Sequence, residues 1–290
     1  MRAAGAGIRS TKRGILLNTF LRAESGQGPG LLAQALRQPR QLVGEQAQGI
    51  FYSHFTSETV IPDAIIASTL GSASSHPDYA AAKGGDIEAA VRLALDLVTP
   101  DLLAKVQAVI GDCKPLVVPV VAEEAAGRNK IPRAAAEVLA QRLGLEAANG
   151  IVQANRAHRT GMDGLDRIFA SVDFAGVVEA RPYLLVDDTL TQGGTFAALA
   201  SHIREGGGSV AGVVALTGKQ YSARIQPCAE SLASLRHKHG DFENEFRAAT
   251  GYGFDALTES EARYLARYEP ADRLRDRISD EGRCGRKRED

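Results

Sequence analysis

The sequence predicts an α/β fold with an open, mainly parallel central sheet, flanked by helices and carrying helical extensions. Two observations lead to this prediction. In the middle of the chain, short and continuously apolar runs alternate with segments of helical periodicity, and glycine-rich or proline-containing turns separate them. Apolar runs without polar alternation are typical of strands that are covered on both faces, as strands of parallel sheets are.

Periodicity and end signals place the individual elements. Ile87, Val91 and Leu95 recur at helical spacing. Pro132 suits the first turn of a helix that Gly144 ends. In chain order we expect helices over 86–98 and 100–110, a strand over 116–121, a helix over 131–143, strands over 151–153 and 183–186, a helix over 196–205 and a strand over 210–216.

Composition divides the chain of 290 residues into three parts. Residues 1–50 are rich in Gly, Gln, Arg and Ala, and we expect a flexible or weakly structured extension. Residues 51–227 hold the alternating elements and form the expected main domain. Residues 228–290 are charged and mainly helical, with a capping box at Thr258-Glu259-Ser260-Glu261, so we expect a helical C-terminal extension.

The overall composition excludes several classes of protein. The net charge of −1 gives no general attraction to nucleic acid, and no apolar run is long enough to span a bilayer. Cys113, Cys228 and Cys284 are too few and too scattered for a disulfide framework or a zinc site. We therefore expect a cytoplasmic protein without a membrane partner, and the sequence leaves a homodimer open.

The segment 184–195 carries the clearest chemistry. An apolar strand leads into Asp187 and Asp188, and a turn of threonines and glycines then opens a helix. Backbone N–H groups at such a turn attract phosphate, and Gly193 and Gly194 let the backbone approach it closely. The two carboxylates suit hydroxyl groups, or Mg²⁺ held near a pyrophosphate. Two alternatives to this interpretation remain. The segment could be an acidic, glycine-rich turn without a ligand, or part of a phosphatase of the haloacid dehalogenase kind.

This segment resembles the ribose-phosphate motif of type I phosphoribosyltransferases. The resemblance implies that Asp187 and Asp188 act in catalysis, contact the ribose hydroxyls and reach Mg²⁺ only indirectly, through the ligand or water. It implies that the turn binds the ribose phosphate through Thr189, Thr191, Gln192, Gly193, Gly194 and Thr195. Gln192 and Thr189 depart from the usual motif, which has a small hydroxyl residue and an aliphatic residue at these places.

The resemblance extends in layout over about residues 110–225 and implies three further groups of site residues. The loop after the strand 116–121 would bind pyrophosphate, and the connection 155–175 would close over the reaction with catalytic cations. The segment after the strand 210–216 would contact the base. These groups are Glu123, Gly127 and Arg128 for pyrophosphate, Arg156, His158 and Arg159 for catalysis, and Lys219 and Tyr221 for the base. Each of the three groups could equally be a set of exposed side chains.

The resemblance implies that the protein would be a phosphoribosyltransferase of nucleotide salvage. It would use Mg²⁺ and transfer ribose 5-phosphate from phosphoribosyl pyrophosphate to a nitrogen acceptor, an unidentified nucleobase or amine, releasing pyrophosphate. The alternative is a non-catalytic sensor or regulatory protein that binds the same ligand or a nucleotide at the same site, because a fold does not fix a function.

Overall fold

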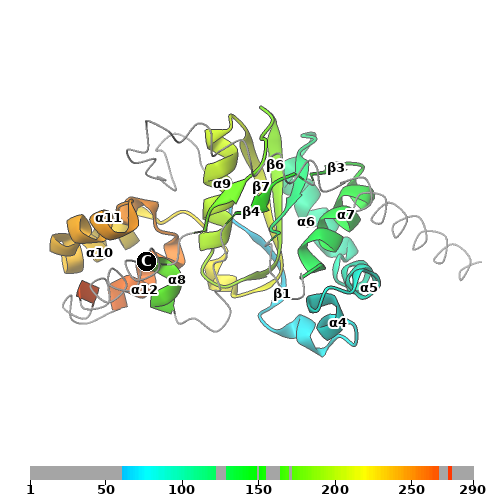
Figure 1. Cartoon of the computed structure of the whole chain (residues 1–290), viewed down its shortest axis with the longest axis horizontal. Helices are drawn as coiled ribbons and strands as arrows, with labels where there is room; N and C mark the ends of the chain where they lie inside the picture. Colours follow the sequence, from blue (N-terminus) through cyan, green and yellow to red (C-terminus); the bar gives the residue numbers. More distant parts are fainter. Residues whose placement is uncertain are drawn as a thin grey trace, which may run out of the picture.

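The computed structural model describes residues 61–121, 129–148, 150–154, 164–169, 172–267 and 274–275. A five-stranded parallel sheet lies at its centre, in the order β1-β7-β6-β2-β3 (Figure 1). The strands are β1 (Ile65–Thr69), β2 (Leu116–Pro119), β3 (Glu146–Ala147), β6 (Pro182–Leu190) and β7 (Ser209–Gly218). The prediction of an α/β fold with a mainly parallel sheet is therefore confirmed.

Helices cover both faces of this sheet (Figure 1). One face packs against α5, α6 and α7, and the other packs against α9. Successive residues of β6 point to opposite sides, so Leu184 belongs to the first core and Leu185 to the second. The helices between β1 and β7 are α4 (Tyr79–Lys83), α5 (Ile87–Leu97), α6 (Pro100–Ile110), α7 (Ile131–Leu143), α8 (Gly164–Phe169) and α9 (Gly194–Glu205).

The helix ends follow the signals in the sequence. The Asp86 carboxylate accepts a hydrogen bond from the Ala89 N–H and begins α5, and Thr99 does the same for Leu102 in α6. Gly144 ends α7 in the left-handed conformation, with φ 66°. Local chemistry therefore determines where these helices start and stop.

Several strands differ from the sequence-based expectation. The strand expected at 151–153 is β4 (Val152–Gln153), which lies outside the parallel sheet and pairs antiparallel with β5 (Phe174–Ala175). The short strands β1 and β3 were not expected, because neither has a long apolar run. β6 also runs on through the acidic pair to Leu190, so the two carboxylates belong to the strand itself.

The C-terminal helices form a third core beside the sheet (Figure 1). Phe242, Phe246 and Phe254 are fully buried there, and α8 packs against them through Phe169. The predicted capping box is confirmed, because the Thr258 N–H donates to Glu261 Oε2 and the Glu261 N–H donates to Thr258 Oγ1. The helices are α10 (Ala229–His239), α11 (Glu243–Thr250) and α12 (Glu259–Arg267).

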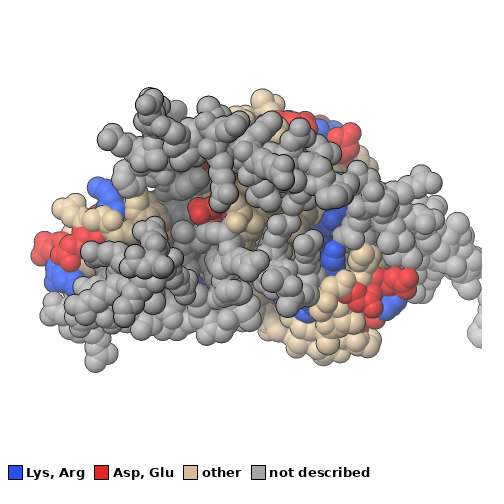
Figure 2. Space-filling view, viewed as in Figure 1, with Lys and Arg blue, Asp and Glu red and all other residues tan. Residues whose placement is uncertain are grey.

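The surface of the described residues mixes charges of both signs. On the face shown in Figure 2, acidic and basic side chains lie close together over the helices at both ends of the molecule. None of the described helices is long and apolar enough to cross a bilayer.

Candidate functional site

The candidate site lies where the connections of two neighbouring strands diverge. The chain leaves β2 for α7 on one face of the sheet, and it leaves β6 for α9 on the opposite face. Because β2 and β6 are adjacent and parallel, a crevice opens beyond their carboxyl ends. Ligands of open α/β sheets bind at this kind of crevice, and the turn that follows β6 is the segment singled out in the sequence.

The turn after β6 is held in one shape from its outer side. Gly193, at the start of α9, has φ 92°, a conformation that favours glycine. The carbonyl of Thr191 accepts a hydrogen bond of 2.7 Å from Ser222 Oγ, and the carbonyl of Gln192 accepts one of 2.7 Å from Thr258 Oγ1. These bonds fix the carbonyls away from the helix start, where the first N–H groups of α9 have no partner within the helix.

The two adjacent carboxylates have different surroundings. Asp187 lines the cavity in front of the turn. Asp188 points the other way, and its Oδ2 lies 2.6 Å from Lys83 Nζ and 3.1 Å from Asn129 Nδ2. Asn129 also accepts a hydrogen bond from the Ile131 N–H at the start of α7. Asp188 therefore ties β6 to α4 and α7, whereas Asp187 faces the space that a ligand would fill.

The difference in surroundings changes the titration of Asp187 and Lys83. Burial, together with the neighbouring charge of Asp188, raises the pKa of Asp187 well above its ordinary value. Burial alone would lower the pKa of Lys83, but the charge of Asp188 and the hydrogen bond to it raise that pKa overall. Lys83 is therefore a fixed positive charge beside the acidic pair, and Asp187 is a carboxylate that holds its proton more tightly than usual.

A cavity of about 360 Å³ brings these groups together. Arg167 reaches it from α8 and lies 3.3 Å from Thr191 Oγ1. Tyr79 and Lys83, four residues apart, reach it from one face of α4. The cavity is lined by Tyr79, Lys83, Arg167, Asp187, Thr189, Leu190, Thr191, Gln192, Gly193, Gly194, Thr195 and Phe196.

The structure brings the predicted ribose-phosphate residues around this one cavity and places others elsewhere. Lys219 and Tyr221 line a second, smaller cavity beside the turn, together with Arg167. Asp188 contacts Lys83 and is absent from the lining of the first cavity. The predicted pyrophosphate and mobile-loop residues Glu123, Gly127, Arg128, Arg156, His158 and Arg159 lie outside the described residues.

Sequence reasoning missed Tyr79, Lys83 and Arg167. The helix α4 is only five residues long and mostly alanine, so it offers no periodic pattern that would mark a site. Arg167 falls in the connection 155–175, in which a catalytic role was expected of Arg156, His158 and Arg159 instead. The one available signal was the spacing of Tyr79 and Lys83, which places two polar side chains on one face of a helix.

We expect that replacing Lys83 with Met lowers the free energy of unfolding by about 1–3 kcal/mol, because the largely buried Asp188 would lose its ion pair. Because the Lys83 side chain is 38% exposed, solvent screens the ion pair, and we expect a loss near the lower end of this range. Urea denaturation measures the change. The matched variant Lys105→Met, which breaks an exposed pair with Asp101, should cost less than about 0.5 kcal/mol.

The pH dependence of the free energy of unfolding tests the same ion pair between Lys83 and Asp188. Because the folded pKa of Lys83 is raised, its stabilising contribution is complete below the unfolded value of 10.5 and is lost as pH rises through the higher folded value. Wild type and Lys83→Met should therefore converge in stability at high pH. Equal stability of the two proteins at neutral pH would contradict the importance of the pair.

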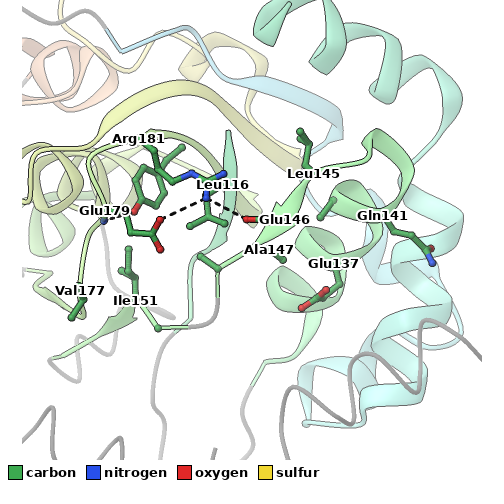
Figure 3. Close-up of a pocket in the computed structure, with 14 residues that line it drawn as sticks. Leu116, Glu137, Gln141, Leu145, Glu146, Ala147, Ile151, Val177, Glu179 and Arg181 are labelled. Atoms are coloured by element: carbon green, nitrogen blue, oxygen red, sulfur yellow. Dashed lines mark hydrogen bonds and ion pairs between the residues drawn. The ribbon is translucent and has the colours of Figure 1, made fainter. Parts of the chain in front are cut away.

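A larger cavity of about 730 Å³ lies at the opposite end of the sheet (Figure 3). It is lined by Leu116 and Tyr183 at the amino ends of β2 and β6, and by the edge strand β3. Arg181 lies between Glu146, at 3.2 Å, and Glu179, at 3.6 Å. Size alone therefore does not identify the site, and this cavity lacks the strand-to-helix turn.

Comparison with known proteins found relatives that match this chain over only part of their own length. No model of a known protein family matches the chain. "Protein TraN" of Escherichia coli is 43% identical over 212 residues, which is 72% of this chain and 47% of TraN. An "Uncharacterized protein" of Haemophilus influenzae is 43% identical over 163 residues, which is 56% of this chain and 36% of that protein. The chain thus spans less than half the length of these curated relatives.

Solved structures give a distant likeness. A crystal structure of adenine phosphoribosyltransferase has a TM-score of 0.31 and 13% identity, covering 46% of this chain and 71% of that one. Adenine phosphoribosyltransferase from Rhodothermus marinus DSM 4252 has a TM-score of 0.27 and 15% identity, covering 44% and 84%. The chain is therefore similar to part of TraN in sequence, and its α/β class follows from its own parallel sheet.

Proposed function

We propose that this protein binds phosphoribosyl pyrophosphate and transfers its ribose 5-phosphate to a nitrogen acceptor. One observation carries the proposal: Asp187, the glycine turn 191–195 and two cations, Lys83 and Arg167, line a single cavity at the point where the strand connections diverge. A ligand with a phosphate at one end, a diol and a pyrophosphate would meet complementary groups in that cavity.

The residues have separate roles in this proposal. The N–H groups at the start of α9 bind the 5′-phosphate, and Gly193 lets the backbone come close to it. Asp187 accepts hydrogen bonds from the ribose hydroxyls. Lys83 and Arg167 bring positive charge to a ligand that is strongly negative, which lowers the cost of placing it beside a carboxylate.

The donor groups also suit a magnesium ion that arrives with the ligand. No cluster of three or more His, Cys, Asp or Glu side chains gathers among the described residues, as a site made by protein alone would need. Mg²⁺ bound to phosphates needs only one or two carboxylates and keeps several waters, so Asp187 fits as a contact made through water or ligand oxygens. Bound there, Mg²⁺ would neutralise charge on the leaving pyrophosphate.

The chemical step would join the acceptor nitrogen to the ribose carbon while the bond to pyrophosphate breaks. Pyrophosphate leaves with the electron pair, and the acceptor loses a proton. The chain contributes by orienting the ribose and stabilising charge, because the reaction passes through a cationic sugar. The acceptor is a nucleobase or amine, and a nucleobase acceptor would make the reaction one of nucleotide salvage.

A second candidate function is a sensor that binds the ligand without turnover. The ion pair of Asp188 with Lys83 favours it, because one of the two carboxylates is already engaged. A single experiment separates the two functions. Purified protein is titrated with phosphoribosyl pyrophosphate and Mg²⁺ in a calorimeter, and pyrophosphate release is then followed across a panel of purine and pyrimidine bases.

For the transferase we expect saturable binding and pyrophosphate release with at least one base. Binding without release from any base of the panel would favour the sensor. Absence of binding to the wild-type protein would refute both functions. The variant Asp187→Asn is the control for each measurement, because it retains the shape of the side chain and removes its charge.

A further inference from the structure

A second cavity lies on the other side of the Thr191–Gln192 turn. Its volume is about 180 Å³, and four parts of the chain form its walls: α8, the turn after β6, the segment that follows β7, and α12. It shares Arg167, Thr191 and Gln192 with the first cavity but is not lined by Asp187. The complete lining is Arg167, Thr191, Gln192, Lys219, Tyr221, Ser260, Arg263, Tyr264 and Arg267.

The lining of this cavity is strongly positive. It includes four cationic side chains and no carboxylate. Within the part of the chain that the structure describes, Lys219, Arg263 and Arg267 make no ion pair, whereas Arg92 and Arg236 elsewhere on the surface pair with carboxylates. The like charges of Lys219, Arg263 and Arg267 around so small a space repel one another, and an anion between them would relieve that repulsion.

Hydrogen bonds hold the walls of the cavity in place. Ser260 Oγ, in the first turn of α12, lies 2.8 Å from Ser222 Oγ, which in turn donates to the carbonyl of Thr191. Thr258 Oγ1, just before α12, donates to the carbonyl of Gln192. The helix that carries Arg263 and Arg267 is thus fixed to the turn, and a ligand would meet cations that are already positioned.

Two aromatic rings accompany the cations. Tyr221 is 62% exposed, although most large apolar side chains of the protein are buried, and Lys219 Nζ lies 5.8 Å from the centre of its ring. Tyr264 lines the same cavity from α12. An aromatic ring next to cations such as Lys219 and Arg263 is the arrangement that stacks on a base while binding the adjoining phosphate.

We propose that this second cavity binds the phosphate of a nucleotide, with the base stacked on Tyr221. The proposal goes beyond the transferase function and does not depend on it, because Asp187 takes no part in this cavity. Arg263 and Arg267 bind the phosphate together with Lys219, and Arg167 lies between the two cavities.

The test is a titration of ¹⁵N-labelled protein with adenosine 5′-monophosphate, followed by NMR. Amide signals of Lys219–Tyr221 and of α12 report the second cavity, and those of Gly193–Thr195 report the first. We expect both sets to shift in the wild type. The double variant Arg263→Gln/Arg267→Gln should weaken binding at the second cavity roughly tenfold or more and leave the shifts at Gly193–Thr195 in place.

The matched control is Lys105→Gln/Arg224→Gln, which removes the same charge from two residues that line neither cavity. This control should bind like the wild type. The proposal fails if α12 signals do not shift in the wild type, or if the Arg263→Gln/Arg267→Gln variant binds as the control does. Both outcomes are read separately from the first cavity, so neither decides the transferase function.

Two more ligands test the class of molecule. Adenosine, which lacks the phosphate, should leave the α12 signals unshifted. Inorganic pyrophosphate should shift them with an affinity that Tyr221→Ala does not change, whereas the same variant should weaken adenosine 5′-monophosphate severalfold. An unchanged affinity for adenosine 5′-monophosphate in Tyr221→Ala would refute the nucleotide and leave a site for anions alone.

Discussion

Replacing Asp187 with Asn should abolish binding of phosphoribosyl pyrophosphate and at the same time make the protein more stable at neutral pH. The two effects have one cause. Burial and the charge of Asp188 raise the pKa of Asp187, so the folded protein holds a carboxylate that would be less costly as a neutral group. Asn keeps the acceptor oxygen for the Asp188 N–H, which donates to Asp187 Oδ1 at 2.7 Å.

The sign of the pH effect follows from the direction of this shift. Asp187 binds its proton more tightly in the folded state, so its contribution to stability falls as pH rises from the unfolded value near 3.8 through the higher folded value. The variant Asp187→Asn has no carboxylate at this position and so does not lose this stability as pH rises. Its melting temperature should therefore exceed that of the wild type above this range, by an amount that shrinks towards pH 3.

The neighbouring substitution Asp188→Asn is the matched control. It should lower the melting temperature, because it removes the partner of Lys83, whose Nζ lies 2.6 Å from the Asp188 carboxylate. Calorimetric titration with the ligand and Mg²⁺ measures binding, and thermal unfolding between pH 4 and pH 8 measures stability. Unchanged affinity in Asp187→Asn would refute the assigned site, and a lower melting temperature would refute the account of its pKa.

The largest loss of stability should follow from Phe246→Ala. Phe246 is fully buried and lies at the centre of the C-terminal core, with its ring centroid 5.4 Å from that of Phe254 and 5.5 Å from that of Tyr252. Removing a ring from a packed core costs about 3–5 kcal/mol, because the cavity left behind collapses only in part. Chemical denaturation measures the change.

The same substitution should reach the candidate site. Phe169 of α8 contacts Phe246, with ring centroids 5.8 Å apart, and the Tyr252 hydroxyl donates to the carbonyl of Ile168. Loosening this contact would displace Arg167 and weaken ligand binding. Phe246→Leu, which retains much of the volume, is the control and should cost less than about 2 kcal/mol. A loss below about 1 kcal/mol in Phe246→Ala would contradict the placement of Phe246 at the centre of a packed core.

The sequence predicted those parts of the fold and site that depend on neighbouring residues. The turn at Gly193 needs only local chemistry, and so do the ends of α6 and α7. Lys83 and Asn129 could not be predicted, because they meet Asp188 only when the sheet brings them together. The hydrogen bond between Asn129 and Asp188 joins residues that are 59 positions apart.

Short strands mark a second boundary of sequence-based prediction. β3 is two residues long, and its partner Val117 defines it more than its own composition does. Likewise β4 was expected in the main sheet but pairs with β5, where Phe174 lies opposite Gln153. Tertiary pairing, which a single sequence does not display, decides such cases.

The sheet order also has a consequence for folding while the chain is being synthesised on the ribosome. β1 leaves the ribosome before every other strand of the sheet, yet among the described residues its neighbour in the sheet is β7 alone, in which Val214 pairs with Ile65. β7 must also pair with β6. β1 therefore cannot pair within the sheet until β7 has been synthesised, and contacts between residues so far apart in sequence form slowly. A nascent chain stalled before residue 209 would hold β6 with one bare edge, which makes it a target for chaperones and for aggregation.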